Sequence, residues 1–311
     1  MAGSPPAGGQ DPLDLLRRDN ATSVAPTDIT SDSMEFLADK YQINFVGNVQ
    51  IVDDRFELKA DKVTTMLDEK FRHKRNEAVG NVEIIRDDNR ATAGRAVFEV
   101  ETGEITLLDN PIITQGANKL AGAEKIRYNK ETGFFRTVGG RPNLQIKSSK
   151  VDTAPKTVKA TPLHGITITR SVIFSGAMDF HLDTRRFNFN GNVHVVDNRF
   201  KLSADSMAAF LNEEFGVSRI EAEGQVVITT TKNDSKAAGG KAVYDVETGL
   251  VTLSDNPVLR QVGIHSWGME LVRYNKETGD FSTEGGRTQM RIENAAEDVD
   301  FGLPDLNGGS K

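Results

Sequence analysis

The sequence contains no cysteine and only one tryptophan, and aromatic residues make up 7% of the chain. The absence of cysteine excludes disulfides, thiolate nucleophiles and cysteine-ligated metal sites. No apolar run approaches the roughly 20 residues that a helix needs to span a bilayer. The 38 lysines and arginines stand against 45 acidic residues, which is the wrong balance for a protein that binds a phosphate backbone. These absences argue against a transmembrane helix and against nucleic acid as a partner.

Catalytic motifs are lacking as well. The five histidines show no metal-ligand spacing, and none accompanies a nucleophile in a recognisable motif. The adjacent carboxylates Asp53-Asp54 and Asp87-Asp88 are more typical of turns than of calcium or glycosidase sites. The sequence therefore predicts a protein that is not an enzyme and has no catalytic residue, no metal site and no cofactor.

The dominant feature is an internal repeat. Residues 47–61 recur at 191–205 with ten identities in fifteen positions, and apolar and polar residues alternate in both copies. Such alternation is typical of antiparallel strands with one buried face. Read as hairpins with two-residue loops, Asp53-Asp54 in the first copy, these segments form matching pairs. The predicted partners are Ile51–Phe56, Val49–Leu58 and Gly47–Ala60, and in the second copy Val195–Phe200, Val193–Leu202 and Gly191–Ala204.

Turn signals repeat with the same regularity. Glu-Thr-Gly occurs four times, at 101–103, 131–133, 247–249 and 277–279, and predicts four equivalent hairpins closed by a left-handed glycine. No long stretch has helical periodicity, so we expect an all-β protein with about ten short strands per copy. The expected domains are a disordered tail at 1–28, a first module at 29–147, a linker at 148–164, a second module at 165–294 and a disordered tail at 295–311.

Two smaller features have ordinary structural explanations. The basic run from Phe71 to Arg75 is not repeated in the second copy, so a solvated loop is favoured over an anion site. Asp61 and Asp205 recur at the ends of the two predicted hairpins. A strand-end aspartate that accepts hydrogen bonds from backbone N–H groups accounts for both.

An apolar stripe is what remains as a candidate site. In an anonymous β protein such a stripe is most simply the core of a sandwich. Its members are Val49, Ile51, Phe56, Leu58, Phe98, Val100, Ile105 and Leu107 in the first copy and Val193, Val195, Phe200, Leu202, Tyr244, Val246, Val251 and Leu253 in the second.

The order of the motifs resembles the OstA-like (LptA) family of lipopolysaccharide-transport proteins. In each copy a Gly-Asn-Val strand is followed by an Ala-Asp, a second Gly-Asn-Val or Gly-Gln-Val strand, an Asp-Asn-Pro and an Arg-Tyr before a glycine turn. The resemblance covers residues 34–147 and 178–293. It implies two tandem open β-jellyroll modules, each a V-shaped, twisted antiparallel sheet whose apolar trough shelters lipid acyl chains.

The resemblance also implies a function. We expect a non-catalytic periplasmic bridge that carries lipopolysaccharide or a related glycolipid from the inner to the outer membrane, with any signal peptide or anchor absent from this sequence. A closed β-sandwich scaffold or carbohydrate-binding module is the alternative. The stripe residues, with Ile51, Phe56, Val195 and Phe200 foremost, would line the lipid path. The two modules should join edge to edge, and their free edges should pair with other jellyroll modules of the pathway or, head to tail, with further copies.

Overall fold

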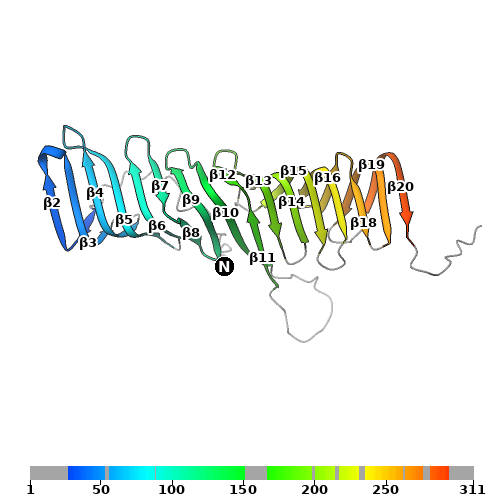
Figure 1. Ribbon diagram of the computed structural model, residues 1–311, viewed down its shortest axis with the longest axis horizontal. Coiled ribbons are helices and arrows are strands. Elements are labelled where there is room, and N and C mark those ends of the chain that lie inside the picture. Colours follow the sequence, from blue (N-terminus) through cyan, green and yellow to red (C-terminus); the bar gives the residue numbers. More distant parts are fainter. Residues whose placement is uncertain are drawn as a thin grey trace, which may run out of the picture.

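The computed structural model describes residues 27–52, 56–87, 89–150, 167–197, 200–213, 217–230, 235–261, 263–275 and 281–293. Within these ranges the chain forms twenty strands in one sheet, and every pairing is antiparallel. Figure 1 shows the strands side by side along the long axis of the molecule, in chain order from β2 at the left to β20 at the right. The all-β prediction is confirmed, although many strands are longer than expected, at up to 16 residues.

Ten strands belong to each module. The first has β1 (Asp28–Thr30), β2 (Ser33–Leu37), β3 (Gln42–Val52), β4 (Glu57–Leu67), β5 (His73–Arg86), β6 (Asn89–Glu99), β7 (Glu104–Leu108), β8 (Ile112–Gln115), β9 (Asn118–Asn129) and β10 (Phe135–Lys150), with a 3-10 turn at Ala38–Lys40. The second has β11 (Thr167–Phe174), β12 (Ala177–His181), β13 (Arg186–Val196), β14 (Phe200–Leu211), β15 (Val217–Thr230), β16 (Lys236–Asp245), β17 (Leu250–Ser254), β18 (Val258–Gln261), β19 (Ile264–Asn275) and β20 (Phe281–Ile292).

Long strands pair with two short strands, one on each side of a bend. β3 pairs with β2 through Gln42–Val46 and with β1 through Gln50–Val52. β6 likewise pairs with β7 and then β8, and β16 with β17 and then β18. The sheet therefore has two arms: a first arm with β2, β7, β12 and β17, and a second arm with β1, β8, β11 and β18. The long strands run through both.

Glycines at the bend explain the repeated Gly-Asn motif. Gly47, Gly80, Gly191 and Gly224 have φ between +76° and +81°, and the residue after each has φ of +45° to +47°. The strand pairing shifts register at each of these positions, so each pair forms a β-bulge. A left-handed conformation is cheap for glycine and tolerable for asparagine. The motif therefore bends each strand from one arm into the other.

The recurring aspartates belong to these bulges. Asn81 Nδ2 donates to both carboxylate oxygens of Asp61, at 3.2 and 3.0 Å, and Gln225 Nε2 donates to Asp205 Oδ1 at 3.5 Å. The expectation that both aspartates accept from backbone N–H groups was therefore wrong, since the donors are side-chain amides. A Cβ on Gly80 would lie 2.2 Å from Asp61 Oδ2, so only glycine fits beneath this carboxylate.

Replacing Gly80 with alanine should lower the free energy of unfolding by about 1–2 kcal/mol more than replacing Gly116. Both glycines have positive φ, and an L-residue there costs roughly 1–2 kcal/mol. A Cβ on Gly116 meets nothing within 4 Å, whereas one on Gly80 displaces Asp61 from its hydrogen bonds. Urea unfolding of the two variants measures the difference. Equal losses of unfolding free energy would mean that the Asp61 carboxylate does not pack tightly over the bulge.

The hairpin register differs from the prediction by two residues. Ile51 lies opposite Leu58 and Val195 opposite Leu202, while Val49 and Val193 lie opposite Ala60 and Ala204. The predicted pairing of Ile51 with Phe56, like that of Val195 with Phe200, was wrong, because each loop has four residues rather than two. Asp53 and Asp54 lie outside the described residues. A shift of two keeps each side chain on its predicted face, so the apolar faces were assigned correctly.

The remaining turn signals behave largely as predicted. Gly103, Gly133 and Gly249 end Glu-Thr-Gly turns with φ of +65° to +68°. The fourth turn, 277–279, lies outside the described residues, although the strands on either side of it pair. In both Asp-Asn-Pro motifs the aspartate and asparagine have φ near +60°, and the proline directly precedes a strand. These motifs carry the chain from the first arm to the second.

The modules join through their edges, as predicted. β10 pairs with β11 over eight residue pairs from Asn143↔Phe174 to Lys150↔Thr167, and with β12 at Phe135↔Phe180 and Arg136↔Asp179. Thr137 Oγ1 adds hydrogen bonds to the backbone N–H and carbonyl of Met178, at 2.9 and 3.2 Å. The sheet therefore continues from one module into the next, and 151–166, which includes most of the expected linker, lies outside the described residues.

The candidate lipid site on the inner faces of the arms

Cross-strand partners on the inner face of the first arm form one continuous row, which we call the aromatic row. Its members pair in succession through both modules. In order they are Phe36, Ile43, Thr65, Asn76, Phe98, Ile105, Tyr128, Phe135, Phe180, Phe187, Ala209, Ile220, Tyr244, Val251 and Tyr274. Burial raises the pKa of the Tyr128 phenol far above its ordinary value, so that this hydroxyl stays neutral.

A second row, the aliphatic row, follows the inner face of the second arm. It is also continuous across the junction. It comprises Ile29, Ile51, Leu58, Ile84, Ala91, Ile113, Leu120, Leu144, Ile173, Val195, Leu202, Ile228, Ala237, Leu259, Ser266 and Met290. At about 4.8 Å per strand, each row extends on the order of 70 Å.

Both rows face a common core, because members of each belong to the same buried apolar cluster. Burial is uneven along them. Ile51 and Val195 are 9% and 8% exposed, whereas Leu58 and Leu202 are only partly buried against that cluster. The half-buried members are the ones that an apolar ligand between the arms would contact first.

The predicted stripe residues divide among these positions. Phe98, Ile105, Tyr244 and Val251 lie in the aromatic row and Ile51, Leu58, Val195 and Leu202 in the aliphatic row, while Val49, Leu107, Val193 and Leu253 are at most 5% exposed beside the bend. Phe56 and Phe200, the last residues of the four-residue hairpin loops, are half-buried against the core. Val100 and Val246 fall in turns after β6 and β16, and Val246 is exposed.

The junction contributes aromatic residues that the stripe does not include. The ring centroids of Phe180 and Phe187 lie 4.4 Å apart, and Phe135 lies 6.1 Å from Phe180 across the module boundary. The sequence signal was present, since Met178-Asp179-Phe180 and Phe187-Asn188-Phe189 repeat the strands at 34–36 and 43–45. Their place in the row depends on the pairing of β10 with β12, which no local pattern indicates.

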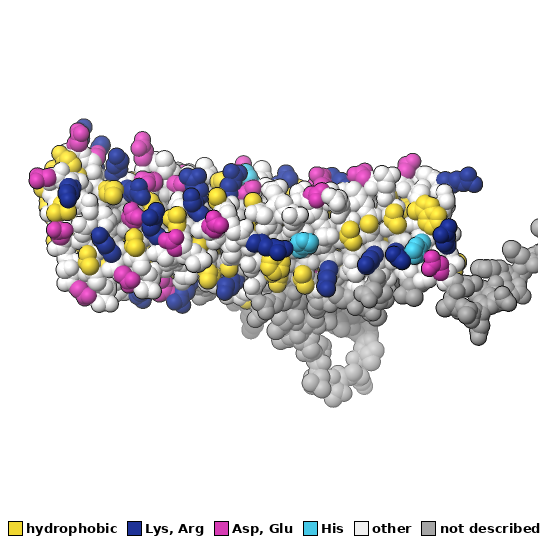
Figure 2. All heavy atoms as spheres, viewed as in Figure 1, with side chains coloured by type: hydrophobic (Ala, Val, Ile, Leu, Met, Phe, Trp, Pro, Cys, Tyr) yellow, Lys and Arg dark blue, Asp and Glu magenta, His cyan; other side chains and the backbone are white. Residues whose placement is uncertain are grey.

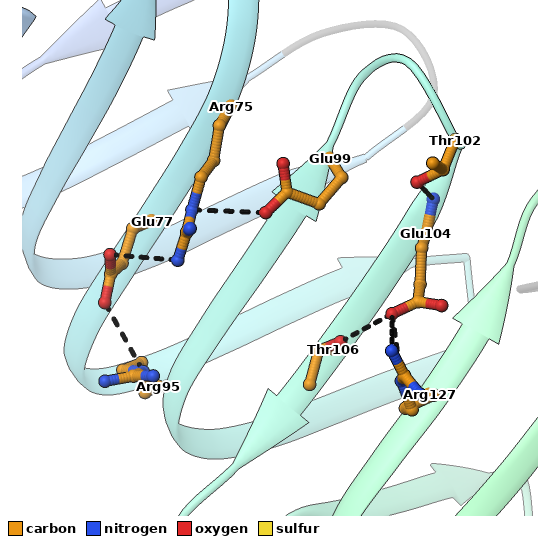
Figure 3. Close-up of polar contacts among 8 residues, drawn as sticks. All are labelled: Arg75, Glu77, Arg95, Glu99, Thr102, Glu104, Thr106 and Arg127. Atoms are coloured by element: carbon orange, nitrogen blue, oxygen red, sulfur yellow. Dashed lines mark hydrogen bonds and ion pairs between the residues drawn. The ribbon is translucent and has the colours of Figure 1, made fainter.

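The outer face carries charged side chains in pairs. Figure 3 shows Arg75 between Glu77 and Glu99, at 3.5 and 3.4 Å, and Arg127 beside Glu104 at 2.8 Å. On the side drawn in Figure 2, apolar side chains appear as separate spots among charged ones. Exposed pairs of this kind contribute about 0–1 kcal/mol each. They keep the outer face solvated, so the continuous apolar surface lies on the inner face.

The basic run is largely neutralised in this way. Arg72 is paired with Asp68 at 2.7 Å, and Arg75 with the two outer glutamates described above. Arg72 is exposed just before β5, as the solvated-loop alternative expects, whereas Arg75 is half-buried within β5. His73, the first residue of β5, is also exposed, and its cross-strand partner is Leu67 of β4.

The described residues offer few side-chain clusters suited to metal binding or catalysis. Among the described residues there is no group of three or more histidine, aspartate or glutamate side chains that could hold a metal ion. The part of the chain that the structure describes also has no helix with the length and apolar character needed to cross a membrane. His181 bonds Asp179 at 3.0 Å on a strand, and His164 and Asp88 lie outside the described residues.

Fold and inner faces together define a tandem β-jellyroll with an apolar interior that runs through both modules. A family model described as LptA/(LptD N-terminal domain) LPS transport protein matches residues 28–134 and 173–279, which is more than half of the chain. The chain belongs to this family of lipopolysaccharide (LPS) transport proteins.

One solved structure similar to the chain is that of LptH, the LptA homologous periplasmic component of the conserved lipopolysaccharide transport device from Pseudomonas aeruginosa. The identity is 17%, over 46% of this chain and 93% of that chain, with a TM-score of 0.33. No curated protein gives a significant match.

Proposed function

We propose that the protein is a non-catalytic periplasmic bridge that carries lipopolysaccharide or a related glycolipid between the inner and outer membranes. The observation that carries this proposal is the continuity of the aromatic and aliphatic rows across the junction of β10 with β11 and β12. A scaffold or carbohydrate-binding protein would need no apolar face that continues across the junction from one module into the next. Membership in a family of LPS transport proteins supports the same conclusion.

The energetics favour acyl chains as the bound portion. Burying one methylene contributes about 0.8 kcal/mol, so a chain of about twelve carbons contributes on the order of 10 kcal/mol if fully sheltered. The half-buried members of the two rows supply the surface for this contact, and the sugars would remain in water beside the polar outer face. The lining residues are the stripe members that lie in the two rows, together with the junction aromatics.

Mass spectrometry of lipids that co-purify with the full chain tests the function directly. Lipopolysaccharide or a related glycolipid should be retained through purification in the absence of detergent. A protein that carries no lipid, and takes up none when lipopolysaccharide is added, would support the closed scaffold instead.

The edges of the sheet have the composition expected of docking surfaces. Met34 and Phe36 in β2 are 63% and 50% exposed, whereas their counterparts Met178 and Phe180 are fully buried beneath β10. Since β20 repeats β10, a second jellyroll module could cover β1 and β2 as β10 covers β11 and β12. The proposed partners are therefore other jellyroll modules of the pathway, and further copies of this chain.

A variant with Met34→Lys and Phe36→Lys should lose this association. In sedimentation velocity, the sedimentation coefficient of the unmodified protein should rise reversibly with concentration. That of the double variant should not change. The same substitutions leave the buried junction untouched, so the circular dichroism spectrum should be unchanged. A protein that stays monomeric at high concentration and binds no other module of the pathway would refute edge pairing.

A further inference from the structure

The two modules differ at one stretch of the aromatic row. In the first module the row contains the polar residues Thr65 and Asn76, on neighbouring strands β4 and β5. The equivalent positions in the second module are Ala209 and Ile220, which pair in the same way. Thr65 and Asn76 are half-buried and lie two residues along their strands from Val63 and Ala78, which belong to the buried core. At this stretch of the aromatic row, a polar group thus faces the interior of the first module only.

Hydrogen bonds orient Asn76 within this group. Its Oδ1 accepts from Thr65 Oγ1 at 2.9 Å and lies 2.6 Å from His73 Nε2, which acts as the donor because an amide oxygen only accepts. Both contacts use the oxygen. Among the described residues nothing accepts from Asn76 Nδ2. The amide therefore presents two free N–H donors on the inner side of the sheet.

A lysine adds positive charge beside this amide. Phe98 is the cross-strand partner of Asn76, and Lys130 Nζ lies 4.8 Å from the centroid of the Phe98 ring. Lys130 is in the turn that follows β9 and is exposed. The Lys130 ammonium thus lies over the ring of the residue that pairs with Asn76 across the strands.

We propose that Thr65, His73, Asn76 and Lys130 form a polar rim that binds an anionic oxygen group, phosphate or carboxylate, at the polar end of an amphiphile. The free groups of the rim are donors and a cation, which recognise acceptor oxygens rather than cations or apolar groups. The tail of the amphiphile would lie along the inner rows, so this inference rests on the proposed function. The second module has Val217, Ala209 and Ile220 at three of these positions and would hold tails without recognising a head group.

Calorimetric titration of the full chain with three probes tests the rim. Dodecyl phosphate and dodecyl maltoside have the same tail but differ in head-group charge, and both are used below their critical micelle concentrations. Inorganic phosphate, the third probe, has no tail. The variant T65A/H73V/N76I installs the residues of the second module, which this fold accommodates. It should bind dodecyl phosphate about tenfold more weakly, as loss of charge-assisted hydrogen bonds predicts. Its affinity for dodecyl maltoside should be unchanged.

Controls separate the possible outcomes. Lys130→Met, in an exposed turn, should weaken dodecyl phosphate binding alone and remains informative if the triple variant does not fold. Equal loss for both amphiphiles, or no loss for either, would overturn the rim while leaving the proposed function intact. Inorganic phosphate binding as tightly as dodecyl phosphate would overturn the assignment to an amphiphile head group. If the unmodified protein binds neither amphiphile, the proposed function fails as well.

Discussion

Replacing Phe180 with alanine is expected to lower the free energy of unfolding by about 3–5 kcal/mol, the range for a large aromatic residue removed from a packed core. Phe180 is fully buried, with its ring 4.4 Å from that of Phe187 and 6.1 Å from that of Phe135. Phe135 belongs to the other module, so the cavity would open at the junction itself. Urea unfolding followed by far-UV circular dichroism measures the loss.

The repeat supplies a matched control for this substitution. Phe36 occupies the equivalent position in the first module and is 50% exposed, because among the described residues β2 pairs only with β3. Phe36→Ala should therefore cost less than about 1 kcal/mol. Similar losses of unfolding free energy at the two positions would contradict the view that Phe180 is buried by pairing between the modules.

Replacing Leu202 with aspartate should abolish lipid retention. Leu202 is a half-buried member of the aliphatic row, between Val195 and Ile228. A carboxylate there would bring water between the arms or remain unpaired in an apolar surrounding, which is strongly unfavourable. The amount of co-purifying glycolipid, measured by mass spectrometry, should fall to background.

Lys201→Asp is the control for the introduced carboxylate. Lys201 is adjacent in β14, exposed, and on the opposite face of the strand. Lipid retention should be unaffected by this change. Loss of lipid in both variants would indicate that charge, and not the inner face, governs binding.

Alternation in the sequence was enough to assign the faces of the hairpins, but it did not determine their register. Side chains alternate with a period of two, so the predicted register of Ile51 against Phe56 and the observed one against Leu58 place the same residues inside. The error arose at the loop, which has four residues. The turn residues Asp53 and Asp54 favoured the shorter loop, and no local signal indicated that the strand pairing ends at Val52 and Glu57.

The candidate site was predictable only in part for a related reason. Local patterning identified Leu58 and Leu202, but it could not distinguish them from Val49 and Val193, which the bend buries almost completely. Burial beside the bend depends on how the two arms meet, and the place of Phe135 in the aromatic row depends on which strands adjoin at the junction. Both are long-range features that strand periodicity does not encode.

The polar interruption of the aromatic row could have been found from the repeat. Aligning the copies places Thr65 and Asn76 against Ala209 and Ile220, a difference visible in the sequence. Its meaning required the structure, which shows that both residues face inward and that Asn76 bonds His73. A difference between copies becomes informative once the face of the strand is known.

We propose that the lipid path runs along the inner faces of the arms. Photo-crosslinking to labelled lipopolysaccharide, from a photoreactive residue at one position at a time, tests it most directly. The half-buried Leu58 and Leu202 are better inner positions than the more deeply buried Ile51 and Val195, and Lys59 and Lys201 are their outer neighbours. We expect labelling from Leu58 and Leu202 only. Equal labelling from both faces, or labelling only from the two lysine positions, would contradict an apolar path between the arms.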